Sequence, residues 1–352
     1  MTMNTNADAV LVRLLGGAWL AKAIAVAARL EIADLIATKP LTAFELAVET
    51  QADPDIMDRL MRLLAACGIF ENIGLNRYAN TSVSALLCSN SEFSLRHFCM
   101  LAGESYYDIW GALLHTVKTG QSACQATFGG SLYDYLEREP EAARVYDLAM
   151  ADLARPVGRL LAERAEFKSA HTVVDVGGGN GTVLQAILAA HPHLQGICLD
   201  RESVCRHALE AIEATNSQRL NFLPGDFFAP LPKGNIYIVK NVLHNWSDAR
   251  CVQLLANIRT SMCPDTILMV LEPFVEPDDH SPRHRMDALL QAVISETGTK
   301  ARSEAQIKGL VSQAGLKVEE TVSITSNCGL VVCRRFESGD QKLTVHIPQR
   351  LI

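Results

Sequence analysis

The segment from Val173 to Gly181 joins a short apolar run to a glycine-rich turn, and it is a place where this chain could hold a ligand. It reads Val-Val-Asp-Val-Gly-Gly-Gly-Asn-Gly, and a helical pattern follows from Thr182. Glycines after a strand let the backbone turn sharply and approach a ligand closely. Free N–H groups at the start of the next helix suit a carboxylate, and Asp175 can fix the loop or meet an ammonium group.

The spacing of these glycines helps to choose between ligands. A dinucleotide site has the pattern Gly-x-Gly-x-x-Gly. Here Gly177, Gly179 and Gly181 alternate with other residues, and Thr182 stands where the third glycine would be. The pattern therefore weakens the interpretation as a nicotinamide site. Taken alone, such a loop is structural about as often as it binds a ligand.

Two further acids follow the next two apolar runs. Asp200, followed by Arg201, can accept hydrogen bonds from both hydroxyls of a ribose. Gly225, Asp226 and Phe227 come after the third run, where an acid and an aromatic ring could hold and stack on an adenine. Ligands bind at the carboxyl ends of strands in open parallel sheets. Three such motifs in order are therefore more specific than any one of them.

A histidine and an acid follow the fourth and fifth apolar runs. His244 lies in Asn-Val-Leu-His-Asn-Trp-Ser-Asp, and Glu272 lies in Leu-Glu-Pro-Phe. A neutral imidazole can take the proton of a phenol, whose pKa is near ~10. An acid beside a histidine fixes its tautomer and raises its basicity. The alternatives are a histidine that only packs or caps a helix and an acid that only caps a loop.

The elements that position these residues alternate between short apolar strands and amphipathic helices. This alternation predicts an α/β fold with a Rossmann-like, mostly parallel, seven-stranded sheet and helices on both faces. The expected strands are Val173–Val176, Gly196–Leu199, Leu220–Leu223, Ile236–Val239, Thr266–Leu271, Val318–Ile324 and Gly329–Arg334.

The first hundred residues are mostly helical in pattern. Thr42 and Glu45 can form a capping box, Pro54 can begin a helix, and Gly68 can end it before a short hairpin. This order is the outline of a winged helix. The first helix is apolar around much of its circumference, which suits a contact between chains.

A winged helix also suggests DNA binding. Its second helix, however, has Arg59 and Arg62 against three aspartates, which is too little positive charge for a phosphate-facing surface. The net charge of −7 has no long run of one sign, so we expect neither a nucleic-acid partner nor an anionic membrane surface.

The length of 352 residues suggests two domains of unequal size. We expect a winged-helix-like dimerisation domain over 1–100 and a cofactor-binding catalytic domain over 101–352, with linker helices over 101–167. The start of the chain does not resemble a signal peptide, and no charge-free apolar stretch predicts a membrane span. The ten cysteines form no Cys-x-x-Cys pair, which favours buried, reduced thiols and a cytoplasmic location.

Taken together, the motifs resemble the class I S-adenosylmethionine-dependent methyltransferases. Within them the chain is similar to the small-molecule O-methyltransferases of plant phenolics and bacterial secondary metabolites, phenazine methyltransferases included. The resemblance covers nearly the whole chain. It implies S-adenosylmethionine as cofactor, S-adenosylhomocysteine as product, and a homodimer in which the N-terminal domain of one chain helps to close the other's pocket.

The resemblance also assigns residues. It implies that His244, in a segment similar to the family's Leu-His-Asp-Trp-Ser-Asp, is the catalytic base and that Glu272 orients it. By position, the implied cofactor contacts are Gly177, Gly179, Asp200, Asp226, Phe227 and Lys240. Asp175, Arg201 and Gly225 complete the predicted cofactor site. The expected activity is methylation of a hydroxyl on an aromatic, phenazine-like or polyketide-like metabolite.

Two departures from the family pattern leave alternatives open. The family's second carboxylate lies in Gly-Gly-x-Glu-Arg-Thr, and Ala301 takes the acid's place here. Asn245 stands where many relatives have aspartate. The base could therefore be less strongly oriented, or the substrate more acidic. Other chemistry on the same fold, of a pericyclase or hydroxylase kind, and N- or C-methylation remain alternatives.

Three positions are predicted to contact the substrate, namely Met150, Asn245 and Asp287, although a helical methionine is more often core and Asp287 could lie on a solvated helix face. His280 and His284, near Asp278 and Asp279, have no clear ligand geometry. We therefore expect no metal.

Overall fold

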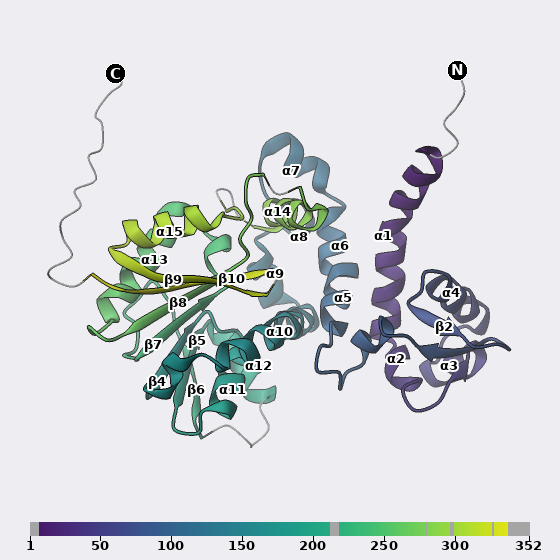
Figure 1. Cartoon of the computed structure of the whole chain (residues 1–352). Helices are drawn as coiled ribbons and strands as arrows, with labels where there is room; N and C mark the ends of the chain where they lie inside the picture. The colour runs from purple at the N-terminus through teal and green to yellow at the C-terminus, as the bar shows by residue number, and fades with distance from the viewer. Residues whose placement is uncertain (1–6, 212–217, 279, 296–298, 326, 337–352) are drawn as a thin grey trace. The chain divides into compact units, whose positions relative to one another are not determined.

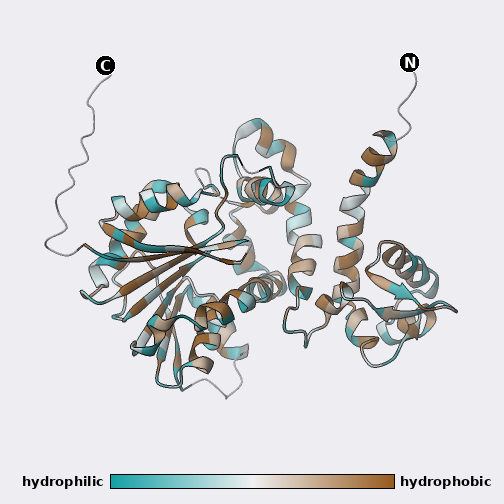
Figure 2. Ribbon diagram, viewed as in Figure 1, coloured by the Kyte–Doolittle hydropathy of each residue, from teal (hydrophilic) through white to brown (hydrophobic). Residues whose placement is uncertain are grey.

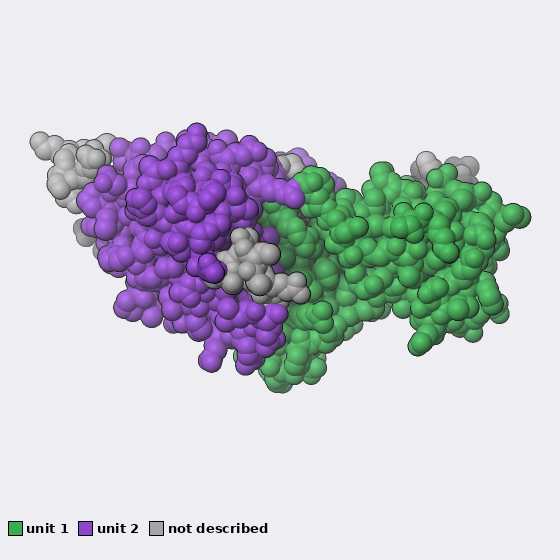
Figure 3. Space-filling view, turned by 90° about the horizontal axis from the view of Figure 1, so that it is seen from below, with its two compact units in different colours: residues 1–156 green, residues 157–352 purple. Residues whose placement is uncertain are grey.

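The structure is a computed structural model that describes residues 7–211, 218–278, 280–295, 299–325 and 327–336. The chain divides into two compact units, Met1–Pro156 and Val157–Ile352, coloured separately in Figure 3. The boundary between the units falls within residues 101–167, where the sequence predicts linker helices. The division into a dimerisation domain and a catalytic domain stays a prediction.

The N-terminal part of the first unit is the predicted winged helix. Thr42 accepts the backbone N–H of Glu45 and the Glu45 carboxylate accepts that of Thr42, so the capping box is confirmed. Asp53 caps the helix that starts at Pro54. The elements are α1 (Ala7–Arg29), α2 (Ile32–Leu35), β1 (Leu41–Thr42), α3 (Ala43–Thr50), α4 (Pro54–Ala66), β2 (Phe70–Asn72) and β3 (Arg77–Asn80), with the antiparallel strand order β1-β3-β2.

Helix α1 carries exposed apolar side chains along its first turns. Leu11, Leu14 and Leu15 are each more than half exposed, and Trp19 is 73% exposed. By length and composition alone, α1 is long and apolar enough to cross a membrane. Signal sequences and core helices of soluble proteins meet the same two criteria. The absence of a membrane span therefore stays an expectation.

The rest of the first unit is helical. Helix α5 packs closely on α1, because a Cβ on Gly103 would lie 2.2 Å from that of Ala25. Lys22 also donates to the Gly103 carbonyl at 2.6 Å. The elements are η1 (Ser84–Leu87), α5 (Arg96–Gly103), α6 (Ser105–Trp110), α7 (Leu113–Thr119), α8 (Ala123–Phe128), α9 (Leu132–Arg138) and α10 (Pro140–Ala162), which continues past Pro156.

The second unit is built on the predicted seven-stranded sheet (Figure 1). Its strands are β4 (Thr172–Val176), β5 (Gln195–Asp200), β6 (Leu220–Pro224), β7 (Ile236–Lys240), β8 (Ile267–Glu272), β9 (Leu316–Thr325) and β10 (Cys328–Arg335). Their order is β6-β5-β4-β7-β8-β10-β9. The first five in this order are parallel, and β10 is antiparallel to both of its neighbours. All seven predicted strands and the α/β class are thereby confirmed.

Helices cover both faces of this sheet, so its central strands are apolar on both sides. All six residues of β8 are buried, and Figure 2 shows the central strands as largely hydrophobic. The helices are α11 (Thr182–Ala190), α12 (Glu202–Ala211), α13 (Asp248–Ser261), α14 (Pro282–Ile294) and α15 (Glu304–Gln313), with short turns η2 (Ala165–Lys168) and η3 (Leu243–Asn245). All ten cysteines are free thiols, but Cys67 and Cys263 are exposed rather than buried.

Candidate active site

The glycine loop after β4 has a backbone that only glycine adopts easily. Gly177, Gly179 and Gly181 have φ of 75°, 59° and 75°. A Cβ on Gly177 would lie 2.8 Å from a methyl group of Val242, whereas one on Gly179 would meet nothing within 4 Å. The loop therefore turns tightly against the protein at Gly177 and leaves open space beside Gly179.

Asp200, the last residue of β5, links the loop to the neighbouring strands. Its carboxylate accepts the backbone N–H groups of Gly179 and Arg201, each at 2.8 Å. Its carbonyl accepts the N–H of Gly225, after β6, at 2.9 Å. Burial raises the pKa of Asp200, and the hydrogen bonds from Arg201 and Gly179 partly counteract that rise. The three predicted cofactor motifs thus meet at one edge of the sheet.

Asp175, on β4 beneath the loop, is 1% exposed. Its Oδ1 atom is buried without a hydrogen-bond partner among the described residues. Burial raises its pKa to about 7, although the nearby Lys240 ammonium acts in the opposite direction. Burial in turn lowers the pKa of Lys240. A buried acceptor without a partner is uncommon in folded proteins, so this edge suits a ligand that brings a hydrogen-bond donor or a positive charge.

Aromatic rings gather beside Asp226. Phe227 and Phe228 each pack edge-on against Trp246, with ring centroids 5.8 and 5.2 Å apart. Asp226 is exposed and accepts the N–H of Phe228 at 2.9 Å. Asn257 donates to the Phe227 carbonyl at 2.8 Å, which fixes this segment on α13. The half-buried Phe227 ring can offer a flat face to an adenine.

His244 and Glu272 form a close pair. The Nδ1 atom of His244 lies 2.7 Å from Glu272 Oε2, while Oε1 accepts the N–H of Leu243 at 2.7 Å. The histidine side chain is 16% exposed and the glutamate 3%. A carboxylate at Nδ1 holds the proton there and leaves Nε2 as the acceptor.

The three predicted substrate contacts lie apart in the chain. Asn245 donates to the Asn241 carbonyl at 3.3 Å, so its side chain braces the turn that carries His244. Asp287 is exposed on α14, and Met150 is partly buried on α10 in the first unit. Their contact with a substrate stays a prediction.

Sequence reasoning missed a buried arginine. Arg302, 3% exposed, donates to the carbonyls of Leu243 at 2.8 Å and Trp246 at 2.7 Å, on either side of His244. In this motif we considered Ala301 and assigned no role to the adjacent Arg302. The available signal was an arginine directly before the helix-capping Ser303, in a motif already singled out.

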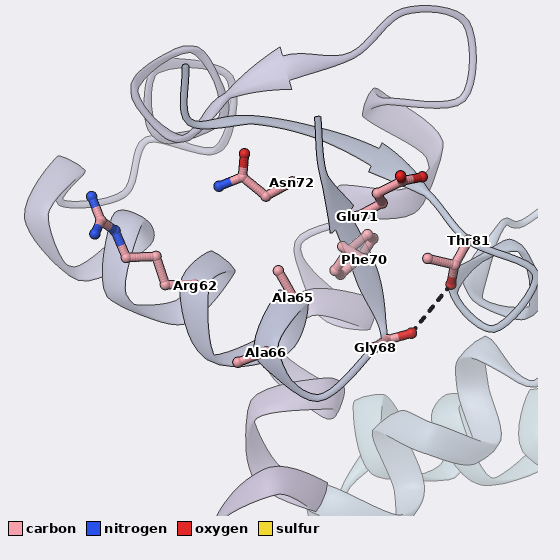
Figure 4. A pocket seen from close by; sticks show the side chains of 8 residues that line it. All are labelled: Arg62, Ala65, Ala66, Gly68, Phe70, Glu71, Asn72 and Thr81. Atoms are coloured by element: carbon pink, nitrogen blue, oxygen red, sulfur yellow. Dashed lines mark hydrogen bonds between the residues drawn. The ribbon is translucent and has the colours of Figure 1, made fainter. Parts of the chain in front are cut away.

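Among the described residues, no group of three or more His, Cys, Asp or Glu side chains could hold a metal ion. Asp279, one of the residues considered for a metal, lies outside them. A separate surface pocket in the first unit lies beside the winged-helix hairpin, between Arg62, Phe70 and Thr81 (Figure 4). None of the predicted site residues line it.

The edge of the sheet thus has the features of an adenosine-type cofactor site next to a histidine–carboxylate pair. Comparison with known proteins identifies the class. Residues 110–317 match the O-methyltransferase domain and residues 12–90 the O-methyltransferase dimerisation domain. The chain belongs to this O-methyltransferase family and is an S-adenosylmethionine-dependent methyltransferase.

Individual relatives span almost its whole length. The phenazine O-methyltransferase PhzM of Lysobacter antibioticus is 33% identical, over 95% of this chain and 99% of the relative. The phenazine-1-carboxylate N-methyltransferase of Pseudomonas aeruginosa is 31% identical, over 94% of this chain and 99% of the relative. The solved structure of NcsB1, an O-methyltransferase from neocarzinostatin biosynthesis in complex with S-adenosylmethionine and a naphthoic acid, is 28% identical, with a TM-score of 0.71 over 90% of this chain and 96% of that one.

Proposed function

We propose that this enzyme methylates a hydroxyl group of an aromatic secondary metabolite, with His244 as general base and Glu272 as the residue that orients it. The observation that carries this proposal is the 2.7 Å contact between His244 Nδ1 and the buried Glu272 carboxylate. With the proton held on Nδ1, Nε2 is free to accept the proton of a substrate hydroxyl.

The cofactor would lie along the edge of the sheet. Asp200 would accept the ribose hydroxyls, Asp226 and Phe227 would hold and stack on the adenine, and Gly177 and Gly179 would let the backbone approach. Asp175, whose Oδ1 has no hydrogen-bond partner among the residues that the structure describes, and Lys240 would lie near the charged amino-acid end. When bound, S-adenosylmethionine supplies an electrophilic methyl group on its sulfonium.

The protein's own residues would then align the substrate hydroxyl with the methyl group and remove the proton of that hydroxyl. A phenol with a pKa near ~10 is largely protonated at neutral pH and is a weak nucleophile. Nε2 of His244 would take that proton as the oxygen attacks, and the buried Glu272 would stabilise the imidazolium. Much of the rate would come from holding the reacting atoms in line.

The substrate class is supported by the relatives, whose names include phenazine, naphthoate and hydroxybenzoate methyltransferases. Because one of them is an N-methyltransferase, a ring nitrogen is the second candidate acceptor. A nitrogen nucleophile has a free lone pair and does not need a base, so the His244–Glu272 pair favours the hydroxyl.

We further propose a homodimer formed through the N-terminal domain, in which each chain helps to close the other's pocket, and a cytoplasmic location. The matched dimerisation domain and the exposed apolar face of α1 support the dimer.

The test compares His244→Ala with the wild type on a panel of hydroxyphenazine, hydroxynaphthoate and hydroxybenzoate acceptors. S-adenosylhomocysteine should form in step with substrate loss, which a pericyclase or hydroxylase would not do. His244→Ala should lose at least about 100-fold in kcat and keep its affinity for S-adenosylmethionine. His171→Ala, at an exposed histidine of the same unit, is the matched control. Unchanged turnover in His244→Ala would remove the base assignment.

A further inference from the structure

The guanidinium of Arg302 lies under the turn that carries His244. Arg302 lies between α14 and α15, and its side chain is 2% exposed. Nη1 donates to the Leu243 carbonyl at 2.8 Å and Nη2 to the Trp246 carbonyl at 2.7 Å. One planar group therefore binds the backbone on both sides of the proposed base.

The Leu243 peptide is held from both of its ends. Its N–H donates to Glu272 Oε1 at 2.7 Å, and its carbonyl accepts from Arg302. The Cys251 thiol, on α13, donates to the same carbonyl at 3.1 Å. The backbone next to His244 is thus bonded by three side chains from three different segments.

The turn η3 needs such partners because its own bonds are few. It is a three-residue 3₁₀ turn, with backbone bonds from Asn245 to Val242 and from Trp246 to Leu243, each of 3.1 Å. Short 3₁₀ turns have poor hydrogen-bond geometry of their own. A rigid fork of N–H donors can span two carbonyls at once, which an ammonium group cannot do in the same way.

We propose that Arg302 is a positioning residue for His244, fixing the turn so that the imidazole keeps its bond to Glu272. This inference rests on the proposed role of His244 as base. The charge of Arg302 is balanced by Asp248, whose carboxylate accepts from Nε at 2.9 Å. We call the two hydrogen bonds from Arg302 to the Leu243 and Trp246 carbonyls the Arg302 clamp. Ala301 supplies no carboxylate, so the Arg302 clamp is what this segment contributes to the orientation of the base.

Lys300 provides a matched control. It binds the same Asp248 carboxylate at 2.9 Å, but its side chain is 46% exposed. Lys300→Met therefore removes a cation from the same segment and the same partner without touching the clamp. Solvent-exposed pairs of this kind contribute little to stability.

The first measurement is the steady-state kinetics of Arg302→Gln, Arg302→Lys and Lys300→Met. We expect Arg302→Gln to lose about 10- to 100-fold in kcat with less than about 3-fold change in the dissociation constant for S-adenosylmethionine. Arg302→Lys, which can reach one carbonyl at a time, should fall between it and the wild type. Lys300→Met should stay within about 2-fold. A folded Arg302→Lys and a folded Arg302→Gln that both keep the wild-type kcat would overturn the proposal.

The second measurement separates positioning from general stability. In the His244→Ala background, Arg302→Gln should cost little further turnover, because the group it positions is gone. In Arg302→Ala, added guanidinium should restore part of kcat. An equal additional loss in the His244→Ala background, or no rescue, would overturn the positioning role alone. Unchanged turnover in His244→Ala by itself would instead overturn the proposed function, and the inference with it.

Discussion

The carboxylate of Asp200 accepts the backbone N–H of Gly179 at 2.8 Å. The residue proposed to hold the ribose therefore also holds the glycine loop. Its other oxygen accepts the N–H of Arg201, and each carboxylate oxygen has a second lone pair for a further donor. The loop shape and the proposed ribose binding thus depend on one side chain.

Asp200→Asn tests this double role. An amide has one acceptor oxygen, so it cannot accept from both backbone N–H groups and two hydroxyls. We expect the dissociation constant for S-adenosylmethionine, measured by calorimetry, to rise at least about 10-fold. Asp265→Asn, at an exposed aspartate before β8, should leave it unchanged. Equal affinities of Asp200→Asn and the wild type would contradict the assignment.

Two glycines of the loop provide a matched pair of substitutions. Gly177→Ala meets both a left-handed backbone and the Val242 methyl group at 2.8 Å, so unfolding experiments in urea should show a loss of about 1–3 kcal/mol. Gly179→Ala meets the backbone cost of roughly 1 kcal/mol but no neighbour. Its methyl group would instead occupy the open space beside the loop, so Gly179→Ala should weaken cofactor affinity more than stability. The reverse order of effects would place the cofactor elsewhere.

The sequence predicted those parts of the fold that depend on short-range patterns, such as helix caps and apolar runs. The capping box at Thr42 and Glu45, the helix start at Pro54 and all seven strands follow from short-range signals. Parallel strands then bring Asp200 and Glu272 to one edge, because their carboxyl ends meet there.

What the sequence did not predict depends on contacts across the chain. Arg302 lies 59 positions from the Leu243 carbonyl that it binds, and no local spacing signals that contact. The hydrogen bond between Gly179 and Asp200 is likewise a contact between distant segments that no local spacing signals. Periodicity also does not reveal how closely α5 packs on α1 at Gly103.

The buried Asp175 predicts a pH dependence of stability. Burial raises its pKa in the folded protein to about 7 from an ordinary value of 3.8. The folded state therefore binds its proton more tightly than the unfolded state, and stability falls as pH rises between these values. Asp175→Asn does not ionise and should lack this fall. Relative to the wild type, its gain in the free energy of unfolding should be larger at pH 8 than at pH 5 by up to about 3 kcal/mol, because about two of the pKa units lie between those pH values. The same difference in the free energy of unfolding at both pH values would contradict the assignment.

Glu272→Gln tests how the base is oriented. A glutamine whose oxygen keeps the Leu243 bond turns its NH₂ group toward His244 Nδ1, so the imidazole would have to accept there and carry its proton on Nε2. We expect kcat to fall by about 100- to 10,000-fold, as in other sites where an acid that fixes a histidine tautomer is replaced. Cofactor affinity should change little. A rate close to that of the wild type across the pH profile would show that Glu272 does not orient the base.

The apolar face of α1 predicts where the two chains meet. Leu11, Leu14, Leu15 and Trp19 are more than half exposed on one chain, and their burial against a second copy would stabilise a dimer by about 25 cal/mol per Å² of apolar surface. Leu15→Glu would place a charge in that contact and lower its affinity. Sedimentation should then report a mass near 38.4 kDa, whereas the wild type should have twice that mass. Leu209→Glu, at an equally exposed leucine on α12, should stay dimeric.

Because we propose that each chain helps to close the other's pocket, Leu15→Glu should also lose turnover while its isolated cofactor affinity persists. A fully active monomer would separate dimerisation from catalysis.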